Sequence, residues 1–232
     1  MRGVTSKNFI SQNRGESLVS GNELLEKIQT KESINLVHQT ILRVYVVMRF
    51  IIKKKPLGFH EMPNIKTAGE FFLGYLMLDA LLANQDRHNE NWGMIQRING
   101  ERHLALTFDH GASLGKNISD KEKDERLNTK DQGRSVLAYT KRAKSWFYAR
   151  NDKKSRLKVI EAFEKFGEFY PEAYKTWIAR LSEVDDVQFK LIIDRVPDHL
   201  MSEVSKNFAL EMIKCNKETI ISNSKFSDLR SS

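Results

Sequence analysis

One segment of the chain is apolar around almost its whole circumference. Residues 67–83, TAGEFFLGYLMLDALLA, place large apolar side chains on every side of a helical wheel. A helix of that kind has to be buried on all faces, so the pattern predicts a central core helix. Thr67 and Glu70 have the spacing of a capping box, which predicts that the helix begins after Thr67.

Helical spacing of apolar residues also appears before and after this segment. Residues 21–29 are expected to form a helix capped by Asn22, and residues 33–53 a longer helix that ends before Pro56. The polar stretch 115–134 is expected to be a surface loop. The expected helices of the second half cover residues 135–148, 153–166, 168–181, 184–194 and 201–221.

The pattern changes to short, partly alternating segments at residues 92–98 and 102–108. Asn99-Gly100 lies between them and favours the tight turn of a β-hairpin. The fold class expected from these elements is therefore mainly α, in an α+β arrangement with one short hairpin. Trp92, in the first strand, and Trp146 are expected to be packing anchors and not stacking platforms.

Composition narrows the class of protein. The chain has 232 residues, of which 40% are hydrophobic, and this suits a single domain with a proper core. Cys215 is the one cysteine, so no internal disulfide can form, and a reducing, cytoplasmic location is expected with the thiol buried in a helix. No apolar run approaches the roughly 20 residues of a membrane span, so no membrane partner is expected.

The chain carries a net charge of +8, which suits either a polyanionic partner or solubility alone. Lysine and arginine residues are spread along the chain, and segments such as DKEKDERLNTKD mix the two signs. Direct binding to nucleic acid is therefore not expected.

The chemistry is concentrated where the central helix meets the hairpin. The stretch NQDRHNEN carries Asp86 and Asn91 five residues apart, and Asp109 follows the second strand in TFDHG. A hairpin returns its second strand to the start of its first, so these three side chains are expected to converge. Two carboxylates and an amide are a suitable oxygen set for Mg²⁺, commonly completed by nucleotide phosphates.

This arrangement is suited to phosphoryl transfer. One Asp would accept the proton of the attacking hydroxyl, while the Asn and the other Asp would hold the metal. Protein kinases have a base and an Asn at this spacing, followed after two strands by a metal-binding Asp beside Phe and Gly. In this sequence Phe108 precedes Asp109, and Gly111 follows one residue later.

The motifs NQDRHNENWG and LTFDHGASLG resemble the C-terminal domain of HipA-like kinases, the serine/threonine kinases of toxin–antitoxin modules. The D-R-H-N-x-N string is also similar, more distantly, to the catalytic loop of phosphatidylinositol 3- and 4-kinases. RGVTSKNF near the start and IIDRVPDHLMSEVSKNFALEMIKCNKETI near the end resemble the matching parts of HipA-like proteins. The resemblance implies the large C-terminal lobe of a protein kinase, with ATP and Mg²⁺ as cofactors and a protein Ser/Thr hydroxyl as acceptor.

Carried over by position, the resemblance makes Asp86 the catalytic base and Asn91 and Asp109 the ligands of nucleotide-bound metal. Arg87 and His88 belong to the same catalytic loop, where they would either brace the turn or approach phosphate. The implied division of the chain is a remnant of the small lobe or hinge over residues 1–20, the kinase lobe over 21–221 and a disordered tail over 222–232.

A complete kinase site needs a Gly-rich loop and a strand-borne Lys on a small N-terminal lobe. No G-x-G-x-x-G occurs in the sequence, so the small lobe is expected to be largely absent. The chain would then need a separate N-lobe partner or be a catalytically inactive remnant, and the family also implies an antitoxin as a further partner.

Two other functions remain open at this point. The chain could be a binding module without catalysis. It could also be a metal-dependent phosphohydrolase, because His88, His103 and His110 lie near Asp86 and Asp109 in the sequence. The spacing of these histidines matches no standard metal-ligand set.

Overall fold

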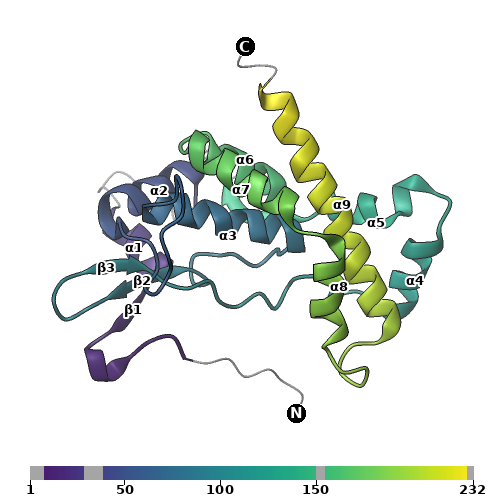
Figure 1. The fold of residues 1–232 in the computed structure, drawn as a ribbon, viewed down its shortest axis with the longest axis horizontal. Helices are drawn as coiled ribbons and strands as arrows, with labels where there is room; N and C mark the ends of the chain where they lie inside the picture. The colour runs from purple at the N-terminus through teal and green to yellow at the C-terminus, as the bar shows by residue number, and fades with distance from the viewer. Residues whose placement is uncertain (1–7, 29–38, 150–154, 229–232) are drawn as a thin grey trace.

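The computed structural model describes residues 8–28, 39–149 and 155–228. Its centre is helix α3 (Ala68–Leu82), which the other elements surround (Figure 1). Thr67 is the N-cap: its side chain accepts from the Glu70 amide, and the Glu70 carboxylate accepts from the Thr67 amide at 2.7 Å. The predicted capping box and the buried central helix are both confirmed.

Three helices from the second half of the chain pack along α3, namely α6 (Val159–Gly167), α7 (Pro171–Glu183) and α9 (Glu203–Asp228). The Phe72 ring of α3 lies edge-on to Phe166 of α6 at 5.5 Å and to Trp92, which lies outside these three helices, at 5.6 Å. All three side chains are fully buried or nearly so. Trp92 is therefore a packing anchor, as predicted.

A three-stranded antiparallel sheet, in the order β1-β2-β3, lies beside this helical core (Figure 1). Strands β2 (Gly93–Gln96) and β3 (Arg102–Leu104) form the predicted hairpin. In the turn Gly100 has φ +82°, the conformation expected of a short hairpin loop closed by a left-handed glycine. Strand β1 (Ser17–Ser20), which pairs with β2, was not predicted because its four residues are too short to show a period.

The helices of the first half differ in detail from the prediction. Helix α1 (Gly21–Lys27) is capped by Ser20 and not by Asn22, because the Ser20 hydroxyl accepts from the Glu23 amide. The predicted helix 33–53 is described from residue 39 onward. It consists of α2 (Ile41–Val46) continued by a π-helical segment, Val47–Ile52.

Residues 115–148 depart most from the prediction. The expected surface loop contains helix α4 (Asp120–Asn128) and a 3-10 turn (Gln132–Arg134). The expected helix 135–148 is a short helix, α5 (Val136–Thr140), followed by strand β4 (Lys144–Tyr148). In β4 exposed and buried residues alternate, and five residues are too few to separate that period from a helical one.

The expected helix 153–166 likewise begins with a strand, β5 (Arg156–Lys158), which pairs antiparallel with β4 before α6 starts. Pro171 occupies the first turn of α7, as predicted. Helix α8 (Asp186–Asp194) precedes the break at Pro197. Helix α9 continues to Asp228, so its backbone extends through part of the segment that was expected to be a disordered tail.

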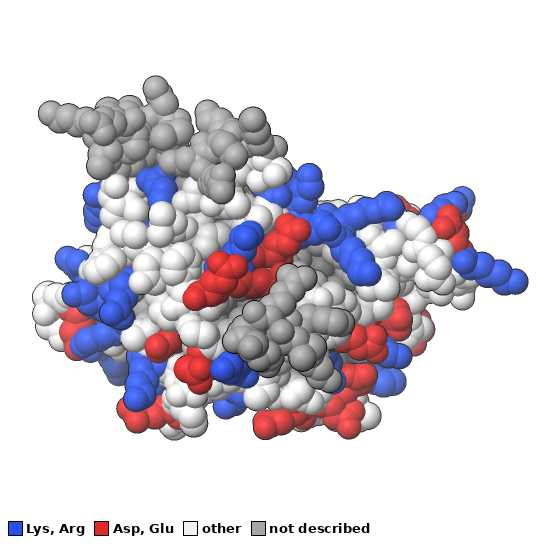
Figure 2. Space-filling model, turned by 90° about the horizontal axis from the view of Figure 1, so that it is seen from above, with Lys and Arg blue, Asp and Glu red and all other residues white. Residues whose placement is uncertain are grey.

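Cys215 lies on α9 and is half-buried, with its thiol 3.6 Å from Glu211 Oε1. Burial raises the pKa of this thiol to about 11, so the group stays protonated near neutral pH and is a poor nucleophile. None of the helices in the described part of the chain has the length and apolar composition needed to span a bilayer. Figure 2 shows a face on which acidic and basic side chains are interspersed.

The packing of α3 against α7 yields a test of the fold. A Cβ on Gly74 would lie 2.5 Å from Cζ2 of Trp177, whose Nε1 is held by the Glu70 carbonyl at 2.8 Å. Gly74→Ala should therefore lower the free energy of unfolding by about 1–3 kcal/mol, although alanine is the better helix former. Chemical denaturation measures the change, and Gly133→Ala, in a roomier turn, should stay within about 0.5 kcal/mol. Equal changes in the two variants would contradict the described packing.

Candidate active site

The site begins where α3 ends. Ala83 adopts the left-handed conformation, φ 49°, and turns the chain out of the helix. Asn84 then donates from Nδ2 to Asp79 Oδ1 at 2.7 Å and accepts from the Asp86 amide at 3.2 Å. Asn84 therefore satisfies a backbone group of the turn, as polar residues at such positions are expected to do, and links Asp86 to the last turns of α3.

Arg87 lies beneath this loop and is only 1% exposed. Its Nε and Nη2 donate to the two oxygens of Asp79, each at 2.8 Å, in a bidentate pair. A buried guanidinium is tolerated when its charge is balanced and its donors are used, and Asp79 meets the first requirement. Asp79 is itself 3% exposed, so neither charge reaches water.

The remaining donors of Arg87 join the two halves of the site. Nη1 donates to the carbonyls of Asn91, at 2.7 Å, and Phe108, at 3.3 Å, while Nη2 also donates to Thr107 Oγ1 at 2.8 Å. One side chain thus holds the loop that carries Asp86 and Asn91 against the segment that leads into Asp109. Backbone pairing supports the same closure, since the Ala105 amide donates to the Gly93 carbonyl.

The three predicted oxygen-bearing residues have different environments. Asn91 is buried and its Nδ2 donates to the Asp86 carbonyl at 2.7 Å, so Oδ1 is the side-chain atom that could contact a metal. The Asp86 carboxylate is 38% exposed. Asp109 is exposed on a left-handed backbone with φ 53°. Two accessible carboxylates and an amide oxygen are ligand types that suit Mg²⁺ arriving with a nucleotide, because the phosphates would supply the other ligands.

His88 and Trp146 border Asp86 on the outer side. His88 Nε2 lies 3.7 Å from Asp86 Oδ1, and the His88 ring is edge-on to Trp146 at 6.0 Å. Trp146 is 40% exposed and the Arg156 guanidinium lies over its ring, so the prediction that it is a packing anchor is wrong. It lies on the outward side of the short strand β4, which was mistaken for a helix.

His110 is held in its neutral form. Its Nε2 lies 3.1 Å from Arg87 Nη2 and 2.8 Å from Thr107 Oγ1. The Thr107 hydroxyl accepts from Arg87 and can donate to Nε2, whereas a proton on Nε2 would face the guanidinium, so the geometry favours Nε2 without a proton. Burial, followed by the Arg87 charge, lowers the pKa of His110 from its ordinary value.

Two residues of the site were missed by sequence reasoning. Asp79 is one, and its signal was a carboxylate inside an otherwise apolar helix, which requires a buried partner. Gln39 is the other: its Nε2 donates to the Arg87 carbonyl at 2.8 Å and its Oε1 accepts from Trp92 Nε1 at 2.7 Å. No local pattern marks Gln39, because both partners are about 50 residues away.

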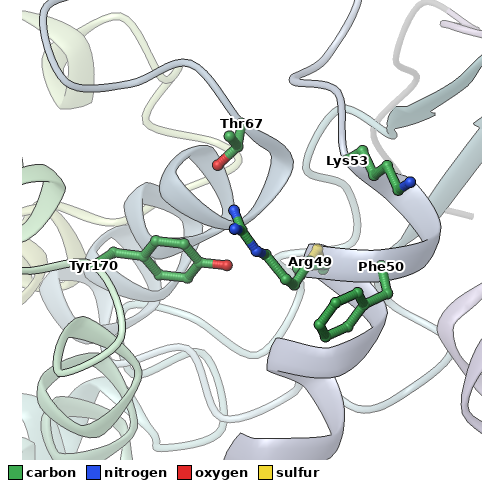
Figure 3. Close-up of a pocket in the computed structure, with 6 residues that line it drawn as sticks. Arg49, Phe50, Lys53, Thr67 and Tyr170 are labelled. Atoms are coloured by element: carbon green, nitrogen blue, oxygen red, sulfur yellow. The ribbon is translucent and has the colours of Figure 1, made fainter.

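A surface pocket of about 350 Å³ is lined by Arg49, Phe50, Lys53, Thr67 and Tyr170, together with Met48 (Figure 3). Figure 3 shows the Arg49 guanidinium directed toward the hydroxyls of Thr67 and Tyr170. Thr67 caps α3 at the end remote from Asp79, about 18 Å along the axis at 1.5 Å per residue. The pocket is therefore separate from the site that Arg87 assembles.

Comparison with known proteins bears on the fold. No protein-family model matches the chain, and no curated protein matches it. Among solved structures, the Helicobacter pylori proinflammatory kinase CtkA is similar, with a TM-score of 0.63 and 22% sequence identity. The match covers 90% of this chain and 73% of that one. At this identity the likeness shows that the chain has a kinase-like fold.

The Asp79–Arg87 pair generates a stability prediction. Asp79→Asn keeps the shape of the side chain but leaves the buried Arg87 charge unbalanced, which should cost about 3–5 kcal/mol of unfolding free energy. Asp86→Asn, at a carboxylate that reaches solvent, should change stability by less than about 1 kcal/mol. Urea denaturation of both variants measures the difference. A cost below about 1 kcal/mol for Asp79→Asn would show that the pair does not hold the site.

The neutral state of His110 generates a pH prediction. Its folded pKa lies below the ordinary value of 6.5, so its contribution to stability is complete above about pH 6.5. The contribution is lost as the pH falls through the folded pKa, because a proton on Nε2 would face Arg87. Between pH 7 and pH 5 the native chain should therefore lose more stability than His110→Gln, whose amide oxygen can accept the same bonds. Denaturation at each pH tests this, with exposed His60→Gln as control; identical slopes for native chain and His110→Gln would contradict it.

Proposed function

We propose that this chain is the large lobe of a kinase that transfers the γ-phosphoryl group of ATP to a Ser or Thr hydroxyl of a protein. The observation that carries the proposal is the set of hydrogen bonds that the buried Arg87 side chain donates to both halves of the site. It ties the loop of Asp86 and Asn91 to the segment of Asp109 through the carbonyls of Asn91 and Phe108. The HipA-like motifs in the sequence and the kinase-like fold support the same function.

Asp86 is the proposed base. Its carboxylate is accessible, and its backbone is held by Asn84 and Asn91. In the proposed reaction Asp86 accepts the proton as the acceptor oxygen bonds to phosphorus, and the bond from phosphorus to the leaving oxygen breaks. A fixed backbone beneath a solvent-accessible carboxylate suits this role, because a general base has to be oriented and reachable.

Asn91 Oδ1 and the Asp109 carboxylate are the proposed contacts to Mg²⁺–ATP. When bound, that group supplies the phosphoryl group and neutralises the charge that develops on it. His88 lies beside Asp86. Of the two roles expected for Arg87, we assign it the bracing of the loop and not the approach to phosphate, because its N–H groups donate to Asp79, Asn91 and Thr107 inside the protein. Phosphates also need a covering lobe, so the proposal includes a separate small lobe. An antitoxin partner is a further prediction from the resemblance.

The phosphohydrolase alternative finds little support in the geometry. Among the described residues, no group of three or more His, Cys, Asp or Glu side chains could hold a metal ion. His110 is committed to Thr107 and Arg87, and His103 Nδ1 lies 3.0 Å from the Lys55 carbonyl. A binding module without catalysis is the alternative that activity measurements have to separate from the kinase.

The proposed function predicts a division of roles between the three site residues. Asp86→Asn should retain Mg²⁺–ATP binding and lose at least about 100-fold in the rate of phosphoryl transfer, since a positioned base contributes about that much or more. Asn91→Ala and Asp109→Asn should weaken Mg²⁺–ATP binding itself. Calorimetry and transfer of labelled phosphate to a Ser-containing protein measure the two properties.

Asp194→Asn serves as the matched control, because it removes an exposed carboxylate whose partner is Lys190 on the same helix. It should leave both binding and transfer unchanged. Transfer that survives Asp86→Asn would remove Asp86 from the mechanism. Nucleotide binding without any transfer by the chain, with or without a small-lobe partner, would favour the non-catalytic alternative.

A further inference from the structure

The two-stranded ribbon β4–β5 places a set of basic and aromatic side chains next to the candidate base. The Lys144 amide donates to Gln85 Oε1 at 3.3 Å, which joins the start of β4 to the residue before Asp86. Two residues further along the strand, the Trp146 ring lies edge-on to His88, with 6.0 Å between the ring centroids. The ribbon is therefore a wall of the site and not a remote surface.

The ribbon has distinct inner and outer faces. Ser145, Phe147 and Leu157 are buried against the core. The alternate positions turn outward, and four of them form what we call the basic ribbon face: Lys144, Trp146, Arg156 and Lys158. The Arg156 guanidinium lies over the Trp146 ring, 4.5 Å from its centroid, so the aromatic side chain also positions a cation.

The charge of this face is unbalanced. Residues 141–149 and 155–158 contain five Lys or Arg and no Asp or Glu. Lys144 lies directly opposite Lys158 in the strand register, a like-charge pair that destabilises a ribbon. Within the described part of the chain, neither ammonium group forms an ion pair with a carboxylate, although Glu161 accepts from the Lys158 backbone amide. An anionic group bound between Lys144 and Lys158 would offset the electrostatic repulsion between their ammonium groups.

We propose that the basic ribbon face docks an acidic segment of the protein substrate and so brings a nearby hydroxyl to Asp86. This inference rests on the proposed function and names its substrate class. Strand β4 has five residues, about 17 Å at roughly 3.3 Å per residue, which matches a short extended peptide. Acidic side chains of such a peptide would meet Lys144, Arg156 and Lys158, while Trp146 offers apolar contact beside His88.

The test uses three fluorescent peptides of equal length, each with one central Ser flanked by Glu, Gln or Lys. Fluorescence anisotropy with the full chain should give a Kd about tenfold lower for the Glu peptide than for the Gln peptide, and the difference should shrink with added salt. The double variant Lys144→Gln/Lys158→Gln should bring the Kd for the Glu peptide close to that for the Gln peptide. Circular dichroism establishes that the variant is folded.

Lys66→Gln/Lys130→Gln is the matched control, because it removes the same charge from exposed lysines outside the ribbon. It should keep the preference for the Glu peptide. Equal binding of the Glu and Gln peptides, or equal loss of preference in both double variants, would overturn the inference. Tighter binding of an oligonucleotide of the same charge through Lys144 and Lys158 would overturn the assignment to a polypeptide.

Binding and transfer separate this inference from the proposed function. Peptide binding needs no ATP, so Asp86→Asn should keep the preference for the Glu peptide. In transfer assays the ribbon variant should raise KM for the Glu peptide about tenfold with little change in kcat. A chain that prefers the Glu peptide through the ribbon but never phosphorylates it would retain the docking surface and refute the kinase function.

Discussion

The site depends on one buried ion pair. Asp79 and Arg87 share two hydrogen bonds out of contact with water, and the donors of Arg87 that remain reach both halves of the site. A charge placed this deep is stable only while every partner is present. The same requirement that makes the pair costly to break also fixes the loop geometry, because a displaced loop would leave a guanidinium unsatisfied. The position of the exposed Asp86 loop is therefore fixed by the buried ion pair beneath it.

Helix α3 makes that constraint possible. Its apolar faces are covered by α6, α7 and α9, so its last turns form a rigid, dry platform from which Asp79 projects. The chain then leaves the helix through the left-handed Ala83 and passes directly into the loop of Asp86. The proposed base is thereby attached to the buried central helix, while its carboxylate stays accessible to a substrate. This separation of a buried support from an exposed reactive group is what general base chemistry requires.

The β4–β5 ribbon gives the same site its outer wall. Its inner face packs on the core and its outer face presents unbalanced positive charge beside Asp86. The support under the loop comes from Asp79, and the wall beside it comes from residues 144–148 and 156–158, which are far away in the chain. The two features differ in role, since the ion pair fixes the geometry of the loop and the ribbon is the surface that we propose selects the charge of the substrate.

The sequence by itself determined the central helix, its capping box and the hairpin, because each shows in a local period or spacing. The same kind of spacing made Asp86, Asn91 and Asp109 the predicted site residues. The lone carboxylate of Asp79 in this apolar helix was a signal that sequence reasoning missed. Only the tertiary structure decided that Arg87 is the partner of Asp79, that Gln39 secures the loop, and that residues 144–148 form a strand with Trp146 outward. These features come from contacts between distant segments, and short strands and buried pairs leave no periodic trace from which a sequence could reveal them.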